Sequence, residues 1–265
     1  MLYDTIFKGG VFVKTEELLS VSLDIGEKML ISGAEISRVE DSLRRILTTY
    51  NIQRADVFTI TSSIVATVTD DEGHTITQTR RIQKYNTDLE KLDALNALSR
   101  QICASAPPIE EIQDALIKTE KKQHYGLGIQ CLAYALIAGA FAVFFGGTWS
   151  DGIAAACLGA LLKLLTYATD RTKINMVFAN AVASFAMCVS AFLCAAVFQS
   201  LQADKIIIGN TMLLIPGIAM TNSIRDIISG DSMAGILRFC EALVIAIAIA
   251  AGYILASLLM GGLLK

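Results

Sequence analysis

A proline-glycine pair, Pro216-Gly217, interrupts an apolar stretch of the sequence. Pro216 has no amide hydrogen to donate to the carbonyl of Met212, so a helix is expected to break here or, alternatively, to kink in a way that only shapes packing. Backbone groups freed at membrane depth need protein, water or solute as partners. Amide and hydroxyl side chains on both sides of the break, and on the preceding apolar stretch, could therefore bind a small polar solute. The predicted substrate-binding residues are Asn180, Asn210, Thr211, Pro216, Gly217, Thr221 and Asn222.

A second group of polar residues follows helical spacing between residues 35 and 45. Acidic and basic side chains are three or four positions apart, as in Glu35 with Arg38 and Glu40 with Arg44, which is typical of an exposed helix face. Glu241 lies near the start of a later apolar stretch. Snorkelling to the membrane surface would explain this glutamate, and a proton relay is the alternative if it faces inward.

Several chemistries have no matching motif in the sequence. The six cysteines form no CxxC pair, and neither the GxSxG nucleophile elbow nor the GxxxxGK[ST] phosphate loop is present. The net charge is -3, and no basic run is interleaved with aromatic residues, as nucleic-acid binding would require. We therefore expect no enzyme activity, no cofactor, no metal site and no nucleic acid as a partner.

Composition divides the chain into a charged part and an apolar part. Hydrophobic residues make up 54% of the 265 positions, and the mean hydropathy is +0.54. Residues 1–125 nevertheless hold 19 of the 25 acidic residues and 15 of the 22 basic ones. This distribution predicts an α-helical integral membrane protein with a small N-terminal α+β cytoplasmic domain.

The cytoplasmic domain is expected over residues 1–122. Apolar residues at helical spacing predict helices over 15–31 and 88–104, and a third helix is expected to follow Pro107-Pro108 to about residue 121. Ser32 and Glu35 fit a capping box that would open a helix to about Thr49. Short β-branched runs between residues 51 and 82, separated by a turn at 70–73, predict two or three antiparallel strands.

The remaining residues, 123–265, are expected to form a transmembrane domain of about five helices. Apolar stretches long enough to cross a bilayer lie near 126–147, 151–168, 174–199, 206–224 and 236–261. Small residues recur every fourth position, as at Ala138 and Ala142, and would allow close helix packing.

Basic residues set the expected orientation in the membrane. They collect at three places that lie on one side under alternating topology: Lys118, Lys121 and Lys122, then Arg171 and Lys173, then Arg225 and Arg238. We therefore expect a multi-pass protein embedded in the lipid bilayer, with its N-terminus in the cytoplasm and its C-terminus outside. An odd number of spans would allow a homologous second half to insert upside down.

Two separated motifs carry a family resemblance. The segments SGAEISRVEDSLRRI at 32–46 and LLIPGIAMTNSIRDIISGDSMAGILRFCEAL at 213–243 resemble the N-terminal half of the threonine/serine exporter family (ThrE), in its split, two-subunit form. The resemblance implies secondary export of small polar solutes such as threonine, serine or a dicarboxylate like succinate. It also implies a location in the plasma membrane of a prokaryote and a second small membrane subunit as partner, and a homo-oligomer is an open alternative.

The resemblance changes the interpretation of the charged motif. Glu35, Arg38 and Glu40, together with Arg225 and Asp226, are then expected to form a polar contact at the cytoplasmic mouth of the membrane domain. The leading hypothesis for the chain is an exporter subunit. The principal alternative is a membrane-anchored regulatory or scaffold protein, and a membrane-embedded enzyme comes third.

Overall fold

The computed structural model describes residues 5–8, 11–70, 73–83, 85, 87–120, 125–171 and 174–263. The chain forms two compact units, which are described separately. The N-terminal unit comprises Met1–Gln123 and Ile218–Phe239, and the helical unit comprises His124–Gly217 and Cys240–Lys265. The expected division near residue 123 places residues 218–239 with the membrane domain, whereas they pack with the N-terminal unit. The basic residues Lys121, Lys122 and Lys173 lie outside the described residues.

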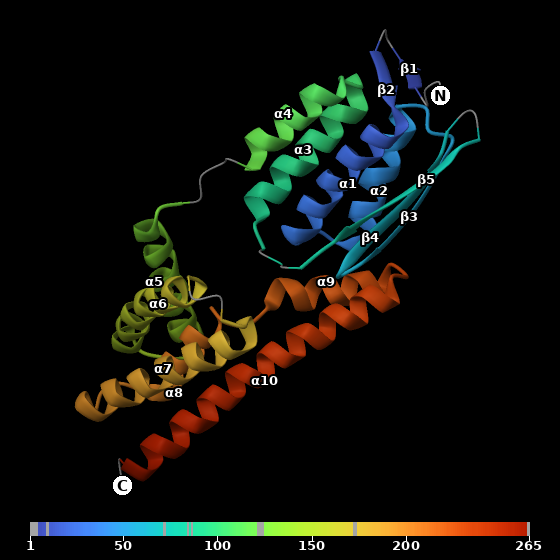
Figure 1. Cartoon of the computed structure of the whole chain (residues 1–265). Helices are drawn as coiled ribbons and strands as arrows, with labels where there is room; N and C mark the ends of the chain where they lie inside the picture. Colours follow the sequence, from blue (N-terminus) through green and yellow to red (C-terminus); the bar gives the residue numbers. More distant parts are fainter. Residues whose placement is uncertain are drawn as a thin grey trace. The chain divides into compact units, whose positions relative to one another are not determined.

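The N-terminal unit is a layered α+β structure, as the sequence predicts (Figure 1). Helices cover one face of a three-stranded antiparallel sheet of order β3-β4-β5. A two-stranded hairpin, which the sequence analysis did not anticipate, precedes the first helix. The elements are β1 (Thr5–Lys8), β2 (Val11–Lys14), α1 (Thr15–Ile31), α2 (Ile36–Thr49), β3 (Arg54–Ile60), β4 (Ser63–Thr69), β5 (Thr75–Arg81), α3 (Leu89–Ser105) and α4 (Ile109–Glu120).

Helix α1 lies at the centre of this unit's core. Leu18, Leu23 and Met29 are fully buried, because α1 contacts α2, α3, α4 and the sheet. Strand β4 alternates buried and half-buried residues along its length, as expected for the middle strand of a sheet with one covered face. Local hydrophobic periodicity is therefore sufficient to predict these elements.

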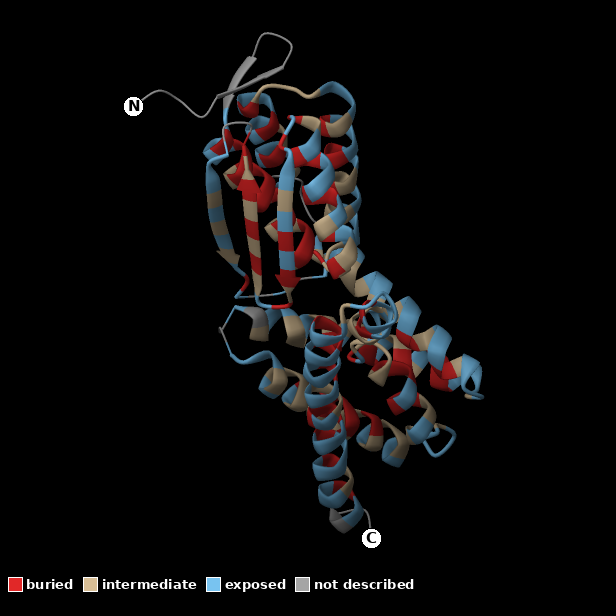
Figure 2. Cartoon of the chain, turned by 90° about the vertical axis from the view of Figure 1, so that its right-hand side faces the viewer, coloured by how far each residue is buried: buried red, intermediate tan, exposed pale blue. Residues whose placement is uncertain are grey.

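The helical unit contains α5 (Leu127–Phe144), α6 (Trp149–Asp170), α7 (Met176–Val197), α8 (Ala203–Thr211) and the larger part of α10 (Ser232–Leu263). Within the described residues, four helices are long and apolar enough to cross a membrane: α5, α6, α7 and α10. Their outward side chains are apolar, with Phe144, Val197 and Leu258 each more than 70% exposed, and Figure 2 shows long runs of exposed residues on the helix that ends at the C-terminus. Such a surface suits a bilayer and is unusual for a protein in water.

The stretch 206–224, which the sequence analysis expects to be one membrane span broken or kinked at Pro216, forms two separate helices. It forms α8, of 9 residues, and α9 (Gly217–Ile228), of 12 residues, separated by a turn that ends at Pro216. The predicted break at Pro216 is confirmed, and its physical cause is the missing proline amide. The two halves also belong to different units, since α9 packs in the N-terminal unit.

Small residues let the helices of the helical unit approach closely. A Cβ atom added to Gly209 of α8 would lie 2.5 Å from the carbonyl oxygen of Ala138 on α5. One added to Gly159 of α6 would lie 2.7 Å from the carbonyl oxygen of Tyr134. Ala138 and Ala142 are fully buried. The packing role that their four-residue spacing predicts is therefore observed.

Candidate functional site

The segment Gly33 to Ile36 leads from the end of α1 into the first residue of α2. Ser32 ends α1, and Gly33 adopts a left-handed conformation with φ of 98°, which lets the following amide, that of Ala34, bond back to the carbonyl of Met29. The expected capping box is therefore wrong. Glu35 stands at the N-cap position without a capping hydrogen bond, and the buried Ser32 hydroxyl has no hydrogen-bond partner among the described residues.

Side chains from α9 and the start of α10 contact this connection instead. The carboxylate of Asp226 accepts a hydrogen bond from the Ile36 amide at 3.2 Å, at the first residue of α2. The Asn222 amide donates to the Gly33 carbonyl at 3.0 Å, and Arg238 donates to the Ala34 carbonyl at 3.2 Å. Arg225 forms an ion pair with Glu35. We call these four contacting residues the clasp: Asn222, Arg225, Asp226 and Arg238.

The centre of the clasp is a buried ion pair. Arg238 Nη1 lies 3.0 Å from Asp226 Oδ2, in a geometry that makes an ion pair without a hydrogen bond. Asp226 is fully buried and Arg238 is 7% exposed. Burial raises the pKa of Asp226, while Arg238 and the Ile36 amide oppose that rise. The carboxylate also lies at the positive end of the α2 dipole, where a negative charge is favourable.

The other residues of the predicted motif have different surroundings. Glu40 accepts hydrogen bonds from the Thr59 amide at 2.8 Å and from Arg44 at 2.9 Å, so it ties α2 to β3 inside the N-terminal unit. Burial raises the pKa of Glu40. Arg38 is exposed on α2 and has no ion-pair partner among the described residues. The structure thus brings Glu35, Arg225 and Asp226 together, and it places Arg38 and Glu40 outside that cluster.

In the helical unit, Asn210 is the most enclosed of the predicted substrate-binding residues. Its side chain is fully buried, and its amide nitrogen donates to the carbonyls of Ala155 at 3.2 Å and Ile206 at 3.0 Å. The Asn210 Oδ1 atom has no hydrogen-bond partner within the described part of the chain. A buried acceptor of this kind is uncommon in a folded protein and is a candidate solute contact.

The remaining predicted residues bond locally or belong to the other unit. Thr211 donates to the Ile207 carbonyl at 2.8 Å, and Asn180 donates to the Met176 carbonyl at 3.0 Å. Pro216 and Gly217 are the last residues of the first segment of the helical unit. Thr221 and Asn222 lie on α9 in the N-terminal unit. Glu241 is exposed on α10, three residues after Arg238. A joint site of all seven residues stays a prediction.

Sequence reasoning does not identify one buried acidic residue, Asp151, and it does not predict the partner of another, Asp226. Asp151 is fully buried, forms a capping box with Thr148 and accepts the Gln202 amide at 2.7 Å, which fixes the start of α6 against the residues before α8. The spacing Thr148-x-x-Asp151 is the signal that predicts this cap. Asp226 was placed in the motif, but its pairing with Arg238 has no local signal. Among the described residues, no group of three His, Cys, Asp or Glu side chains could hold a metal ion.

Comparisons with known proteins agree with the resemblance. The model of the ThrE family, described as "Putative threonine/serine exporter", matches residues 20–260. A "Threonine/serine exporter" of Corynebacterium glutamicum is 24% identical over 242 residues, covering 89% of this chain and 50% of that protein. A "Probable threonine/serine exporter" of Mycobacterium tuberculosis is 22% identical over 247 residues, covering 91% of this chain and 46% of that protein.

The chain spans about half the length of these curated relatives. No solved structure matches it. The family model nevertheless extends from α1 into α10 and so includes both units. The chain therefore belongs to the threonine/serine exporter family.

Proposed function

We propose that this chain is one subunit of a secondary exporter that moves small polar metabolites out of the cytoplasm. Threonine and serine are the first candidates, because the relatives bear those names, and a dicarboxylate such as succinate is the second. The observation that carries the proposal is the buried Asn210, whose free acceptor lies six residues before the Pro216 break. Polar groups inside an apolar helical unit are costly, and in transporters they mark the solute path.

The broken helix supports a solute site at this position. Discontinuous helices in transporters expose unpaired backbone groups that bind the substrate near the middle of the bilayer. Leaving the buried Asn210 acceptor unsatisfied costs about 1–3 kcal/mol, which a solute hydroxyl or ammonium group would offset by donating to it. Pro216 and Asn210 are close enough in sequence to act on the same end of α8.

A five-crossing topology requires more than the short helix α8 for its fourth crossing. Nine residues at about 1.5 Å each extend about 14 Å, which is less than half of a bilayer core of about 30 Å. The fourth crossing would therefore use α8 together with the turn 212–216 rather than a continuous helix. With the N-terminus in the cytoplasm, five crossings place the C-terminus outside.

A second membrane subunit completes the proposed exporter. An odd number of crossings lets a homologous half insert with the opposite orientation and form an inverted pair around the solute site. In this arrangement the chain supplies one half of the transport path and the N-terminal unit. The partner is then a small helical membrane protein of the same family.

Efflux from cells expressing the chain with its candidate partner tests the proposal. Cells are loaded with labelled threonine, serine or succinate, and efflux is divided by the amount of folded protein in the membrane. Pro216→Ala restores an amide and should lower efflux by about tenfold with little loss of protein. Ser190→Ala is the matched control, because Ser190 only donates to the Ala186 carbonyl of its own helix.

Two outcomes would contradict this proposal. Efflux of all three solutes that is equal with and without the chain would favour the scaffold alternative. Normal efflux by both Pro216→Ala and Asn210→Leu, with normal abundance, would remove the break and the Asn210 acceptor from the solute path.

A further inference from the structure

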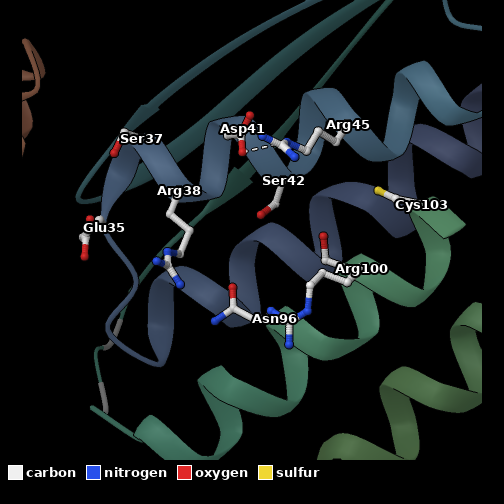
Figure 3. A pocket seen from close by; sticks show the side chains of 10 residues that line it. Glu35, Ser37, Arg38, Asp41, Ser42, Arg45, Asn96, Arg100 and Cys103 are labelled. Carbon is white, nitrogen blue, oxygen red and sulfur yellow. Dashed lines mark ion pairs between the residues drawn. The ribbon is translucent and has the colours of Figure 1, made fainter.

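An open groove of about 580 Å³ lies between α2 and α3 in the N-terminal unit. Figure 3 shows its side chains: Arg38 points from α2 toward α3, on which Asn96 and Arg100 lie. The groove exists because small side chains, Ser42 on α2 and Ser99 on α3, occupy positions between the helices. Its volume falls in the range of small-molecule sites in proteins.

The charges along the groove are not balanced. Asp41 pairs with Arg45 at 2.8 Å, and Glu35 pairs with Arg225 of the clasp. These two pairs leave the guanidinium groups of Arg38 and Arg100 without an acidic partner among the described residues. Both arginines are exposed, they come from different helices, and they line the same groove. The groove therefore carries two positive charges that no carboxylate in the described part of the chain neutralises.

Two serine hydroxyl groups line the same groove as the two arginines. Ser42 is 9% exposed and Ser99 is 6% exposed, so both form part of the floor of the groove. Neither hydroxyl has a hydrogen-bond partner in the described part of the chain, and each has a proton to donate. A hydroxyl that remains accessible at the bottom of a basic groove is suited to donate to an oxygen atom of a bound anion.

We propose that this groove binds a small anion that carries two carboxylate groups or one phosphate group. Arg38 and Arg100 would each contact its oxygens, because a guanidinium presents two parallel donors that match a carboxylate or phosphate. Ser42 and Ser99 would donate to the oxygens that face the floor. The site is independent of the proposed solute path, since its residues belong to the N-terminal unit and Asn210 belongs to the helical unit.

Calorimetric titration of the full-length protein in detergent tests this site. Succinate and inorganic phosphate are the two probes. Binding of each is measured at constant ionic strength, with chloride as the background anion. Arg38→Gln and Arg100→Gln should each weaken binding of the preferred probe about tenfold or more, since each removes a charged hydrogen-bonding group. Arg81→Gln on β5 is the control, because it removes one exposed arginine charge that lies outside the groove. The affinity of this variant for the probe should stay within about twofold of the parent protein.

The probes and a further variant separate the possible outcomes. Tighter binding of succinate identifies a dicarboxylate site, and tighter binding of phosphate identifies a phosphate site. Arg38→Lys keeps the charge without the paired donors, so it should fall between Arg38→Gln and the parent protein. Unchanged affinity in the Arg38→Gln, Arg100→Gln double variant would overturn the proposal, and so would an equal loss in Arg81→Gln. Neither result depends on export activity.

Discussion

Removing the charge of Asp226 is the sharpest test of the clasp. In Asp226→Asn, the retained side-chain oxygen can still accept the Ile36 amide, so the helix cap is largely preserved. Arg238, however, loses the carboxylate 3.0 Å away and stays buried, with the Ala34 carbonyl as the hydrogen-bond acceptor that remains to it. The substitution therefore isolates the ion pair from the hydrogen bond to α2.

The expected effect follows from the burial of both partners. Breaking a buried ion pair by removing one member costs about 3–5 kcal/mol, because the other charge is left uncompensated. Arg238 keeps one hydrogen bond, so the lower end of this range applies. A loss of about 3 kcal/mol corresponds to about a hundredfold more frequent opening of the connection between α1 and α2.

Hydrogen exchange of full-length protein in detergent measures this opening directly. Amides of residues 33–43 should lose protection about a hundredfold in Asp226→Asn. Asp41→Asn on α2 is the matched control, because it breaks an ion pair whose side chains are 59% and 71% exposed, and such pairs contribute about 0–1 kcal/mol. The double variant Asp226→Asn, Arg238→Gln should recover part of the protection, since it removes both charges.

Equal exchange in Asp226→Asn and Asp41→Asn would refute this reasoning. It would mean that water or rearranged side chains compensate Arg238, and that the pair does not hold α9 and α10 at the start of α2. The free energy of opening lost in each single variant, Asp226→Asn and Arg238→Gln, can be added and compared with the loss in the double variant. A loss in the double variant that equals this sum would also contradict an energetic coupling between Asp226 and Arg238.

Two further predictions concern topology and pH. Cysteines introduced at Ser200 and Asp231 should be labelled from opposite sides of the membrane, because the segment between them is expected to cross it; labelling from one side would exclude five crossings. Burial raises the pKa of Glu40, so the native protein retains this proton to higher pH than the unfolded chain does. Stability should therefore fall as pH rises from about 4.3 through the raised pKa, and Glu40→Gln should flatten that slope in thermal unfolding followed by helicity. An unchanged slope would contradict this assignment.

Local patterns predicted most of the elements because the forces behind them act over a few residues. The turn at 70–73 and the β-branched runs beside it predicted the strands that became β3, β4 and β5. The break at Pro216 followed from one missing amide. The capping box failed although Ser32 and Glu35 have the right spacing, because Gly33 favours the left-handed conformation that ends a helix, and this ends α1 at the same place.

The clasp could not be predicted from local patterns. Asp226 and Ile36 are 190 positions apart, and the intervening sequence gives no sign that they meet. The resemblance predicts a polar contact of Arg225 and Asp226 with Glu35, but the sequence indicates Arg238 only as a basic residue near a membrane surface, which accounts for its charge and not for its burial. Only the folded chain shows that Arg238 is enclosed while Arg225 remains half exposed at its side chain.

The free acceptor on Asn210 bears on which solute the proposed exporter carries. The amide nitrogen of Asn210 is engaged by two backbone carbonyls, so the side-chain oxygen is the atom left to meet a solute. An acceptor requires a donor, which threonine and serine supply through their ammonium and hydroxyl groups. Succinate at neutral pH has carboxylates, which are acceptors only. The side chain at this position therefore favours an amino acid over a dicarboxylate as the exported solute, whereas the paired arginines of the N-terminal groove have the opposite preference.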